Sequence, residues 1–497
     1  MGTYITFPEL LIWLPLLAGI LCFFTKREQA AKSMALIFSL IILGISIVSL
    51  FYTDAKHAEW NAANYFYKNN IGSTFFVGLD GTGRLLTFLT ALAFPIIFIA
   101  TYRNSYKNPS SFYGLMLLTQ AGLMGVFCSM DALLFYFFWE LALIPVYFLC
   151  SKWGGEKRIQ TTFKFFVYTF LGSLLMLVGI IYVYLHSPGR TFVEDGTQVI
   201  HSFAFSAFQN AHLTVSEENW LFWLFFIAFA VKMPIFPLHT WQPDTYDQSP
   251  TAVTMVLSGV MVKMGLFGVI RWLIPIFPHA AEKFSHVIMI LSIIGIIYAS
   301  CIAMMQDNIK KLVAYSSIAH IGLMCAALFA AKQVSTQGVM LQLFNHGINI
   351  IGMWIVVDLL EQQTGVKEIS KLSGVANKAP VLTILFVIIA LANIALPLTN
   401  AFTGEFLMFS GLYQFNAWYA AVAGIGIILA AVYTLNMIQK VFYGNSNSVV
   451  DAVKDISWNE KFILGAIVCL IFIVGVYPQP VIDLTKDAVA GLLAIMK

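Results

Sequence analysis

Residues 231–268, VKMPIFPLHTWQPDTYDQSPTAVTMVLSGVMVKMGLFG, decide the fold class. Lys232 is followed closely by Pro234 and Pro237, and a polar stretch leads to Pro250. An apolar run then begins and carries a second lysine, Lys263. The run has about 20 mostly apolar residues, which is the length of a helix that crosses a bilayer. The segment therefore predicts a membrane-spanning helix with a lysine near its middle, preceded by an interrupted helix.

The composition of the whole chain agrees with this assignment. Hydrophobic residues make up 59% of the 497 residues, and only 11% are charged. An average soluble domain has about 25% charged residues, so this chain cannot cover a soluble surface. The net charge of +3 gives no general basic surface for nucleic acid.

Apolar stretches long enough to span a membrane recur along the chain. We therefore expect an all-α integral membrane protein of about fourteen transmembrane helices. The stretches fall near residues 7–24, 33–51, 84–101, 111–129, 131–150, 162–186, 219–240, 251–272, 285–305, 310–331, 335–360, 380–412, 416–440 and 460–480. The longer connections are 52–83 and 187–218.

Two of these stretches predict broken helices. The seventh contains Pro234 and Pro237, and the twelfth, 380–412, is too long for one simple span and has Pro397 among polar residues. Paired interrupted helices in the two halves of a transporter mark a substrate path, although proline also kinks packed membrane helices. The breaks lie five helices apart, which predicts two five-helix units. The expected segments are helices 1–3 (1–110), helices 4–8 (111–272), helices 9–13 (285–443) and helix 14 (444–497).

The distribution of Lys and Arg predicts the orientation of the chain. With the N-terminus outside, loops on the inner side hold 17 basic residues and the opposite side holds 9. Positive charge favours the cytoplasmic side, so we expect both termini on the outer side. The two remaining basic residues, Lys232 and Lys263, lie inside helices.

Ionisable side chains inside apolar stretches are the candidate functional residues. A charge at the bilayer centre costs at least about 3 kcal/mol, so each needs a partner, water or the bundle interior. Lys–Glu pairs and histidines suit a proton relay, while the alternative is ion pairs that only hold helices together. Six such groups on six helices favour the relay: Glu140, Lys232, Lys263, His320, His346 and Glu405.

Three other polar residues are weaker candidates. His239, beside the first break, is a secondary candidate that could simply cap exposed backbone. Asp358 is near a helix end, and we expect it to reach the headgroup region. Asp131, at a helix start, is expected to cap the backbone amides there.

The sequence carries no sign of a redox cofactor. The six cysteines lie in or at the ends of apolar stretches without a CxxC, and no GxGxxG or P-loop is present. We therefore expect no site for NADH, flavin, haem, an iron–sulfur cluster or another metal in this chain.

The segment 231–268 resembles the signature of the antiporter-like subunits of respiratory complex I, NADH:quinone oxidoreductase. FWELALIPVYF, KKLVAYSSIAHIG, LFNHGINIIGMW and GEF resemble further motifs of that family. The resemblance covers nearly the whole chain. Glu405 stands where two paralogues and the antiporter relatives usually carry Lys, so the chain is most similar to the subunit M branch, called subunit 4 in mitochondria. Tyr246 departs from the family, which often has His in that loop.

The resemblance implies a function and a role for each candidate. The family fold is two inverted five-helix repeats with broken helices 7 and 12. Glu140 and Lys232 resemble the pair of the first half-channel, and Lys263 resembles the lysine that links the halves. His320 and His346 resemble bridging groups, and Glu405 resembles the exit-side residue of the second half-channel.

The resemblance also implies partners and a location. The expected partners are the other membrane-arm subunits, above all two paralogous antiporter-like subunits, together with lipids and protons. FMN and iron–sulfur clusters would lie in other subunits. The expected location is a bacterial plasma membrane, with a plastid or mitochondrial inner membrane as the alternative.

Three functions compete at this point. The first is a proton-translocating subunit driven by distant NADH oxidation and quinone reduction. The second is a subunit of a multi-component Na+/H+ antiporter or a membrane-bound hydrogenase. The third is a scaffold that conducts nothing. Glu405 favours the first over the second, and the six buried titratable groups argue against the third.

Overall fold

The computed structural model describes residues 5–52, 59–65, 72–188, 190–192 and 198–496, and these are almost entirely helical. Eleven helices in this part of the chain are long and apolar enough to cross a membrane. They are α2 (Glu28–Phe51), α3 (Gly81–Ala100), α4 (Pro109–Cys128), α5 (Ala132–Trp153), α6 (Arg158–Leu185), α10–α12 (Thr251–Ile276), α13 (Pro278–Met305), α14 (Ile309–Phe329), α15 (Gln333–Thr364), α18 (Ala417–Phe442) and α19 (Trp458–Val476). A shorter apolar helix, α1 (Phe7–Phe23), precedes them. The spans follow the apolar stretches of the sequence to within a few residues at most ends.

The first break lies where the sequence predicts it. Helix α8 (Val215–Lys232) ends at Lys232, and the short helix α9 (Gln242–Gln248) begins after nine non-helical residues. Proline has no N–H to donate and clashes with the preceding turn, which ends α8. The carbonyl of Val231 that the break frees accepts a hydrogen bond from Trp241 Nε1 at 2.9 Å.

The second break divides the twelfth span in the same way. It separates α16 (Pro380–Asn393) from α17 (Asn400–Phe415). Ala395 and Leu398, between them, have positive φ angles of 57° and 74°. Side chains of α15 hold the start of α17: Asn345 Nδ2 donates to the Asn400 carbonyl at 2.7 Å, and the side-chain amides of Asn349 and Asn400 pair at 3.0 Å. Broken backbone at membrane depth is tolerated where it is buried in protein or lines a water-filled cavity.

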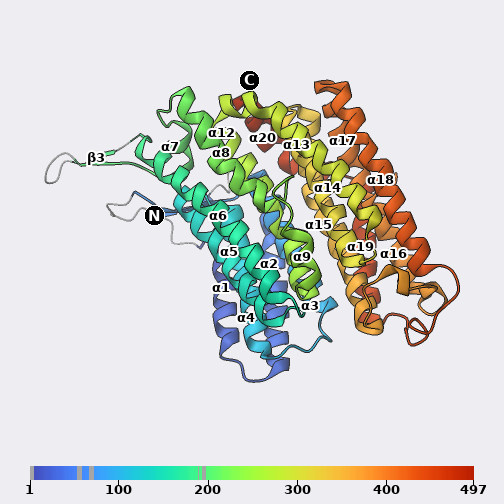
Figure 1. The fold of residues 1–497 in the computed structure, drawn as a ribbon. Helices are drawn as coiled ribbons and strands as arrows, with labels where there is room; N and C mark the ends of the chain where they lie inside the picture. Colours follow the sequence, from blue (N-terminus) through green and yellow to red (C-terminus); the bar gives the residue numbers. More distant parts are fainter. Residues whose placement is uncertain (1–4, 53–58, 66–71, 189, 193–197, 497) are drawn as a thin grey trace.

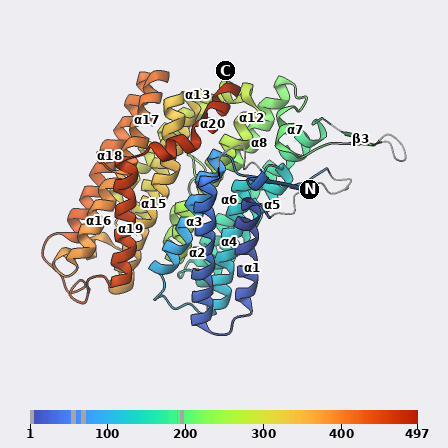
Figure 2. The same ribbon diagram turned by 180° about the vertical axis from the view of Figure 1, so that it is seen from behind.

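The two halves of the molecule lie side by side. Figure 1 shows α1–α9 in blue to green in one half and α13–α19 in yellow to red in the other, and Figure 2 shows the same division from behind. Two spans are buried throughout their apolar windows, the span Thr251–Ile276 and the 32-residue helix α15. They pack against each other, and α15 also packs against α14 and α17 of the second half. The centre of the bundle is therefore formed by helices that are shielded from lipid.

The central span Thr251–Ile276 is not a uniform α-helix. It runs α10 (Thr251–Val256), a π-helical segment at Leu257–Met261, α11 (Lys263–Gly268), a second π-helical segment at Val269–Leu273, and α12 (Ile274–Ile276). π-Helical segments are rare and occur frequently at functional sites. Lys263 follows the first one after a single residue, Val262.

The connections between the spans and the C-terminal region carry small elements that the sequence analysis did not predict. Strands β1 (Ala62–Tyr65) and β2 (Phe75–Gly78) form an antiparallel hairpin with Ala62 opposite Gly78. Strands β3 (Arg190–Phe192) and β4 (Gln198–Ile200) form another, followed by the short helix α7 (Phe205–Gln209). Helix α20 (Gln479–Ile495) follows α19 and packs against α3 and α15. Two 3-10 turns, Ile369–Lys371 and Val375–Asn377, lie between α15 and α16.

Candidate proton pathway

Lys263 lies at the centre of the bundle and is completely buried. Its Nζ donates to the Ser258 carbonyl at 2.7 Å and lies 2.9 Å from His346 Nδ1. The intervening π-helical turn widens the helix, and Lys263 Nζ bonds a carbonyl five residues back. When Lys263 is protonated, both partners must accept, because an ammonium group can only donate.

His346, on α15, links Lys263 to the second half. When Lys263 is protonated, His346 Nδ1 accepts, so Nε2 carries the hydrogen and donates to Ser317 Oγ at 3.3 Å. The rings of His346 and His320 lie 5.7 Å apart between centroids. A single water or a small rotation of either ring spans that gap.

His320, on α14, contacts Glu405 on α17. His320 Nδ1 lies 3.1 Å from Glu405 Oε1, and both side chains are buried. Lys263, His346, His320 and Glu405 therefore form one continuous row from the central span to the second broken helix. The role of the two histidines as bridging groups, which the family resemblance implies, stays a prediction.

A shell of polar side chains holds the His320–Glu405 pair. Asn393 Nδ2 lies 3.4 Å from His320 Nε2 and donates to Ser316 Oγ at 3.3 Å, and Tyr433 donates to the same Ser316 Oγ at 3.0 Å. Gln342 Nε2 donates to Glu405 Oε1 at 3.4 Å.

A cavity of about 20 Å³ lies beside His320, Glu405 and Tyr433, which is room for one water. Sequence reasoning missed these supporting residues. Asn393 could have been predicted as a functional residue, because its polar side chain ends an apolar run directly before the second break.

The first half has a different arrangement. Among the described residues, Lys232 Nζ has no hydrogen-bond partner and lies 5.7 Å from the centre of the Trp139 ring and 5.9 Å from that of Phe165. Glu140 Oε1, on α5, is also unpartnered within the described chain. The described residues contain no ion pair between Glu140 and Lys232 within 4.0 Å.

Three weaker candidates differ in outcome. His239 Nδ1 has no partner among the described residues, and its ring lies 5.8 Å from Phe236 and 5.2 Å from Tyr298. Asp131 caps α5, as expected, by accepting from the amides of Leu133 and Leu134. Asp358 is 7% exposed, accepts hydrogen bonds from Gln362 Nε2 and Asn104 Nδ2, and lines a cavity among the neighbouring loops, so its expected reach to the headgroup region stays a prediction.

The chain resembles known proteins along its whole length. A family profile described as NADH:quinone oxidoreductase/Mrp antiporter, TM, matches residues 129–430. Subunit M of the NADH-quinone oxidoreductase of Rickettsia typhi is 33% identical over 494 residues, covering 97% of both chains. The F(420)H(2) dehydrogenase subunit M of Methanosarcina mazei is 31% identical, covering 98% of this chain and 99% of the relative. A chain in the structure of respiratory complex I from Thermus thermophilus superposes with a TM-score of 0.89 at 26% identity, covering 98% and 99% of the two chains.

Proposed function

The chain belongs to the family of antiporter-like membrane subunits of NADH:quinone oxidoreductase, on the subunit M branch, and we propose that its buried ionisable side chains carry protons across the membrane. It is a multi-pass membrane subunit with no redox role of its own in this proposal. The proposed pathway consists of Glu140, Lys232, Lys263, His346, His320 and Glu405, with His239 as a secondary member.

One observation carries this proposal. Lys263 of the central span, two histidines and Glu405 of the second broken helix form a continuous row of contacts in which each member can bind a proton. A scaffold needs no such row, because replacing buried charges with apolar residues of similar size is often neutral or stabilising. A relay needs titratable groups at hydrogen-bond distance or one water apart.

The pathway divides between the two halves. We propose that residues 111–272 and 285–443 form two repeats of inverted orientation, flanked by 1–110 and 444–497. Each repeat then has a broken helix in its fourth position, α8/α9 and α16/α17. This symmetry supports a half-channel in each repeat, with Lys263 between them.

The rest of the complex supplies the driving reaction. We propose that this subunit lies beside two paralogous antiporter-like subunits, and that FMN and iron–sulfur clusters lie in other subunits. Moving one proton against about 200 mV takes about 4.6 kcal/mol, which the electron transfer must deliver through the neighbouring subunits. The location that fits the bacterial relatives is the plasma membrane, with both termini outside.

The pair of matched variants Glu405→Gln and Glu368→Gln tests the proposal. Glu405 is buried beside His320, whereas Glu368 is exposed on the inner side. In the assembled complex in sealed vesicles, Glu405→Gln should slow proton translocation and quinone reduction about tenfold, equivalent to about 1.4 kcal/mol in the limiting barrier. Glu368→Gln should match the parent. Normal translocation by assembled Glu405→Gln complex would remove Glu405 from the pathway and the proposal with it.

A sodium–proton antiporter is the second candidate, because the description of the matching family also names Mrp antiporters. The composition of the purified complex separates the two. Co-purification with flavin and iron–sulfur subunits supports the redox-driven pump. A complex without redox subunits, whose proton flux depends on Na+, supports the antiporter.

A further inference from the structure

The two ring nitrogens of His320 have different partners. Nδ1 lies 3.1 Å from Glu405 Oε1, and Nε2 lies 3.4 Å from the side-chain amide nitrogen of Asn393. Asn393 is the last residue of α16, directly before the second break, and its side chain is buried. These two neighbours therefore decide which nitrogen of the ring carries the hydrogen.

The amide of Asn393 selects one form of the neutral ring. An amide nitrogen only donates, so His320 Nε2 must accept from it. A neutral imidazole carries one hydrogen, which then lies on Nδ1 and is donated to the Glu405 carboxylate. The structure thus holds His320 in the state that precedes proton transfer to Glu405.

Passage of a proton through the ring reverses these roles. A proton that binds Nε2 makes an imidazolium, and the proton on Nδ1 then moves to Glu405 Oε1. His320 is neutral again, but its hydrogen now lies on Nε2, and Nδ1 accepts from the Glu405 carboxylic acid. The hydrogen on Nε2 needs an acceptor, which an amide nitrogen is not. Asn393 meets that need only if its side chain turns over and presents its oxygen, Oδ1.

The surroundings of Asn393 allow both orientations of its amide. In the structure, Ser316 Oγ accepts from Asn393 Nδ2 at 3.3 Å and from the Tyr433 hydroxyl at 3.0 Å. A hydroxyl has one donor and two acceptor sites, so Ser316 can donate to Asn393 Oδ1 after the turn while Tyr433 keeps donating. The last torsion of an Asn side chain has a broad, two-fold preference, so the turn meets little torsional resistance.

A purely structural role explains these contacts less well. Among the described residues, the Asn393 side chain has hydrogen bonds only to side chains of α14, and none to backbone, so it does not cap the end of α16. Its contacts at 3.3 and 3.4 Å are longer than the usual distance of about 2.9–3.0 Å, which favours exchange over firm anchoring. A side chain that both donates and accepts is needed only if His320 changes state.

We propose that Asn393 is a positioning residue that switches the hydrogen of His320 between its two nitrogens. Its amide donates to Nε2 before a proton passes to Glu405, and accepts from Nε2 afterwards. After Glu405 releases its proton, a water takes the hydrogen from Nε2 and returns one to Nδ1, and the amide turns back. The cavity of about 20 Å³ beside His320 and Glu405 has room for that water. The switch rests on the proposed function and deepens it.

Three substitutions at one position separate the switch from packing. Asn393→Gln keeps an amide, Asn393→Asp keeps the shape but only accepts, and Asn393→Leu keeps the size but neither donates nor accepts. Asn210→Asp is the control, because Asn210 is exposed after the short helix α7. Proton translocation and quinone reduction are measured in the assembled complex in sealed vesicles.

The switch predicts the order of the rates. Asn393→Gln should stay within about twofold of the parent, because it still serves both states. Asn393→Leu should be about fivefold slower, because Nε2 then has no partner in either state. Asn393→Asp should be about tenfold slower or worse, because its carboxylate holds the hydrogen on Nε2. The control should match the parent.

Packing alone predicts the opposite order, with Asp nearest the parent and the longer Gln most damaged. Parental rates in Asn393→Asp or Asn393→Leu, or a Gln variant no faster than the Leu variant, would overturn the switch. If Asn393→Asp does not assemble, the comparison of Asn393→Gln with Asn393→Leu decides.

Nitrogen-15 NMR of the full-length chain with labelled histidine gives a readout that packing does not move. The His320 signals are those lost in His320→Gln. Nε2 should be free of hydrogen in the parent and should carry hydrogen in Asn393→Asp. Equal protonation of Nε2 in the two proteins would overturn the switch.

The outcome for Glu405 separates the two levels of the proposal. If Glu405→Gln stalls translocation while all three Asn393 variants behave as the parent, the switch fails and the proposed function stands. If Glu405→Gln translocates normally, the proposed function itself fails, and the switch with it.

Discussion

At the scale of single residues, the two halves differ in how their charges are satisfied. Glu405 and His320 are in contact and surrounded by Asn393, Gln342 and a hydroxyl pair. Lys232 and Glu140 each have an unpartnered polar atom within the described chain. Unpaired buried charge is costly, so the first half is the place where a second arrangement, with the two side chains paired, gains most.

We therefore predict that Glu140 and Lys232 pair during the transport cycle. Glu140→Gln keeps the shape of the side chain but removes the counter-charge of the ammonium, and Lys232→Met removes the ammonium itself. Each should slow proton uptake and quinone reduction, and the double variant should be little worse than the more damaged single variant. The measurement is a double-mutant cycle, with an expected coupling of about 0.5–3 kcal/mol. The pairing would be contradicted by losses of activity that simply add in the double variant, as they do for independent sites, or by parental activity in both single variants.

At the scale of elements, the sequence predicts the spans and the breaks but not the local winding. The interruptions are predictable from Pro234, Pro237 and Pro397, because proline cannot continue the helix that precedes it. No residue type in the sequence predicts the π-helical turn before Lys263. This turn packs against α15, and that packing accommodates its extra residue. The hairpins are three or four residues per strand, too short for an alternating pattern to stand out. Six candidate site residues were predictable from the sequence, because each is an ionisable side chain in an apolar stretch. Asn393, Gln342 and Tyr433 are neutral, so they are recognised as supporting residues only from their contacts in the structure.

Close contact between α15 and α17 positions Glu405 and gives the second prediction. A Cβ at Gly338 would lie 2.7 Å from the Met408 backbone nitrogen and 2.8 Å from the Gly404 carbonyl, so Gly338→Ala forces the two helices apart. We expect a loss of about 1–3 kcal/mol in unfolding free energy and slower proton translocation. Gly424→Ala is the control, because a Cβ there meets nothing within 4 Å. Equal midpoints of thermal unfolding for the two variants in detergent would contradict this prediction.

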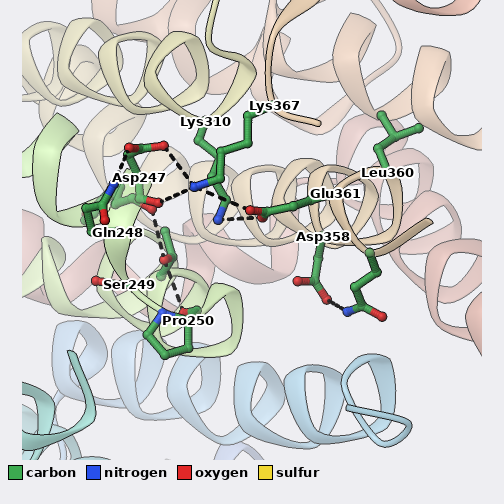
Figure 3. Close-up of polar contacts among 12 residues, drawn as sticks. Asp247, Gln248, Ser249, Pro250, Lys310, Asp358, Leu360, Glu361 and Lys367 are labelled. Atoms are coloured by element: carbon green, nitrogen blue, oxygen red, sulfur yellow. Dashed lines mark hydrogen bonds and ion pairs between the residues drawn. The ribbon is translucent and has the colours of Figure 1, made fainter. Parts of the chain in front are cut away.

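At the scale of the whole molecule, the two spans shielded from lipid hold the central groups of the proposed pathway. The central span and α15 hold Lys263 and His346, and the flanking helices bring Glu140, Lys232, His320 and Glu405 toward them. Burial of the ionisable groups among these helices lets a low-dielectric bundle hold charge without exposing it to lipid. Ion pairs of Lys310 with Glu361 and of Lys367 with Asp247 join the ends of α9, α14 and α15 (Figure 3), so the first broken helix is tied to the second half.

The orientation of the whole chain is the third prediction. The bias of 17 basic residues to 9 predicts that both termini lie outside. It also predicts that the ion pairs among Asp247, Lys310, Glu361 and Lys367 lie on the cytoplasmic side. A reporter fused after Lys497 should be active only in the outer compartment, and one inserted in the inner loop near residue 448 should be active only in the cytoplasm. The reverse result would contradict this orientation and would place both termini on the cytoplasmic side.

The central claim is that protons cross through Lys263. The most direct test is the proton-to-electron ratio of the assembled complex in sealed vesicles for Lys263→Met, with Lys283→Met on the exposed outer side as the matched control. Lys263→Met removes the titratable group that contacts His346, so turnover should fall about tenfold or more and the remaining turnover should carry fewer protons per electron. Lys283→Met should match the parent in both quantities. A parental ratio and rate in the Lys263→Met complex would contradict the account.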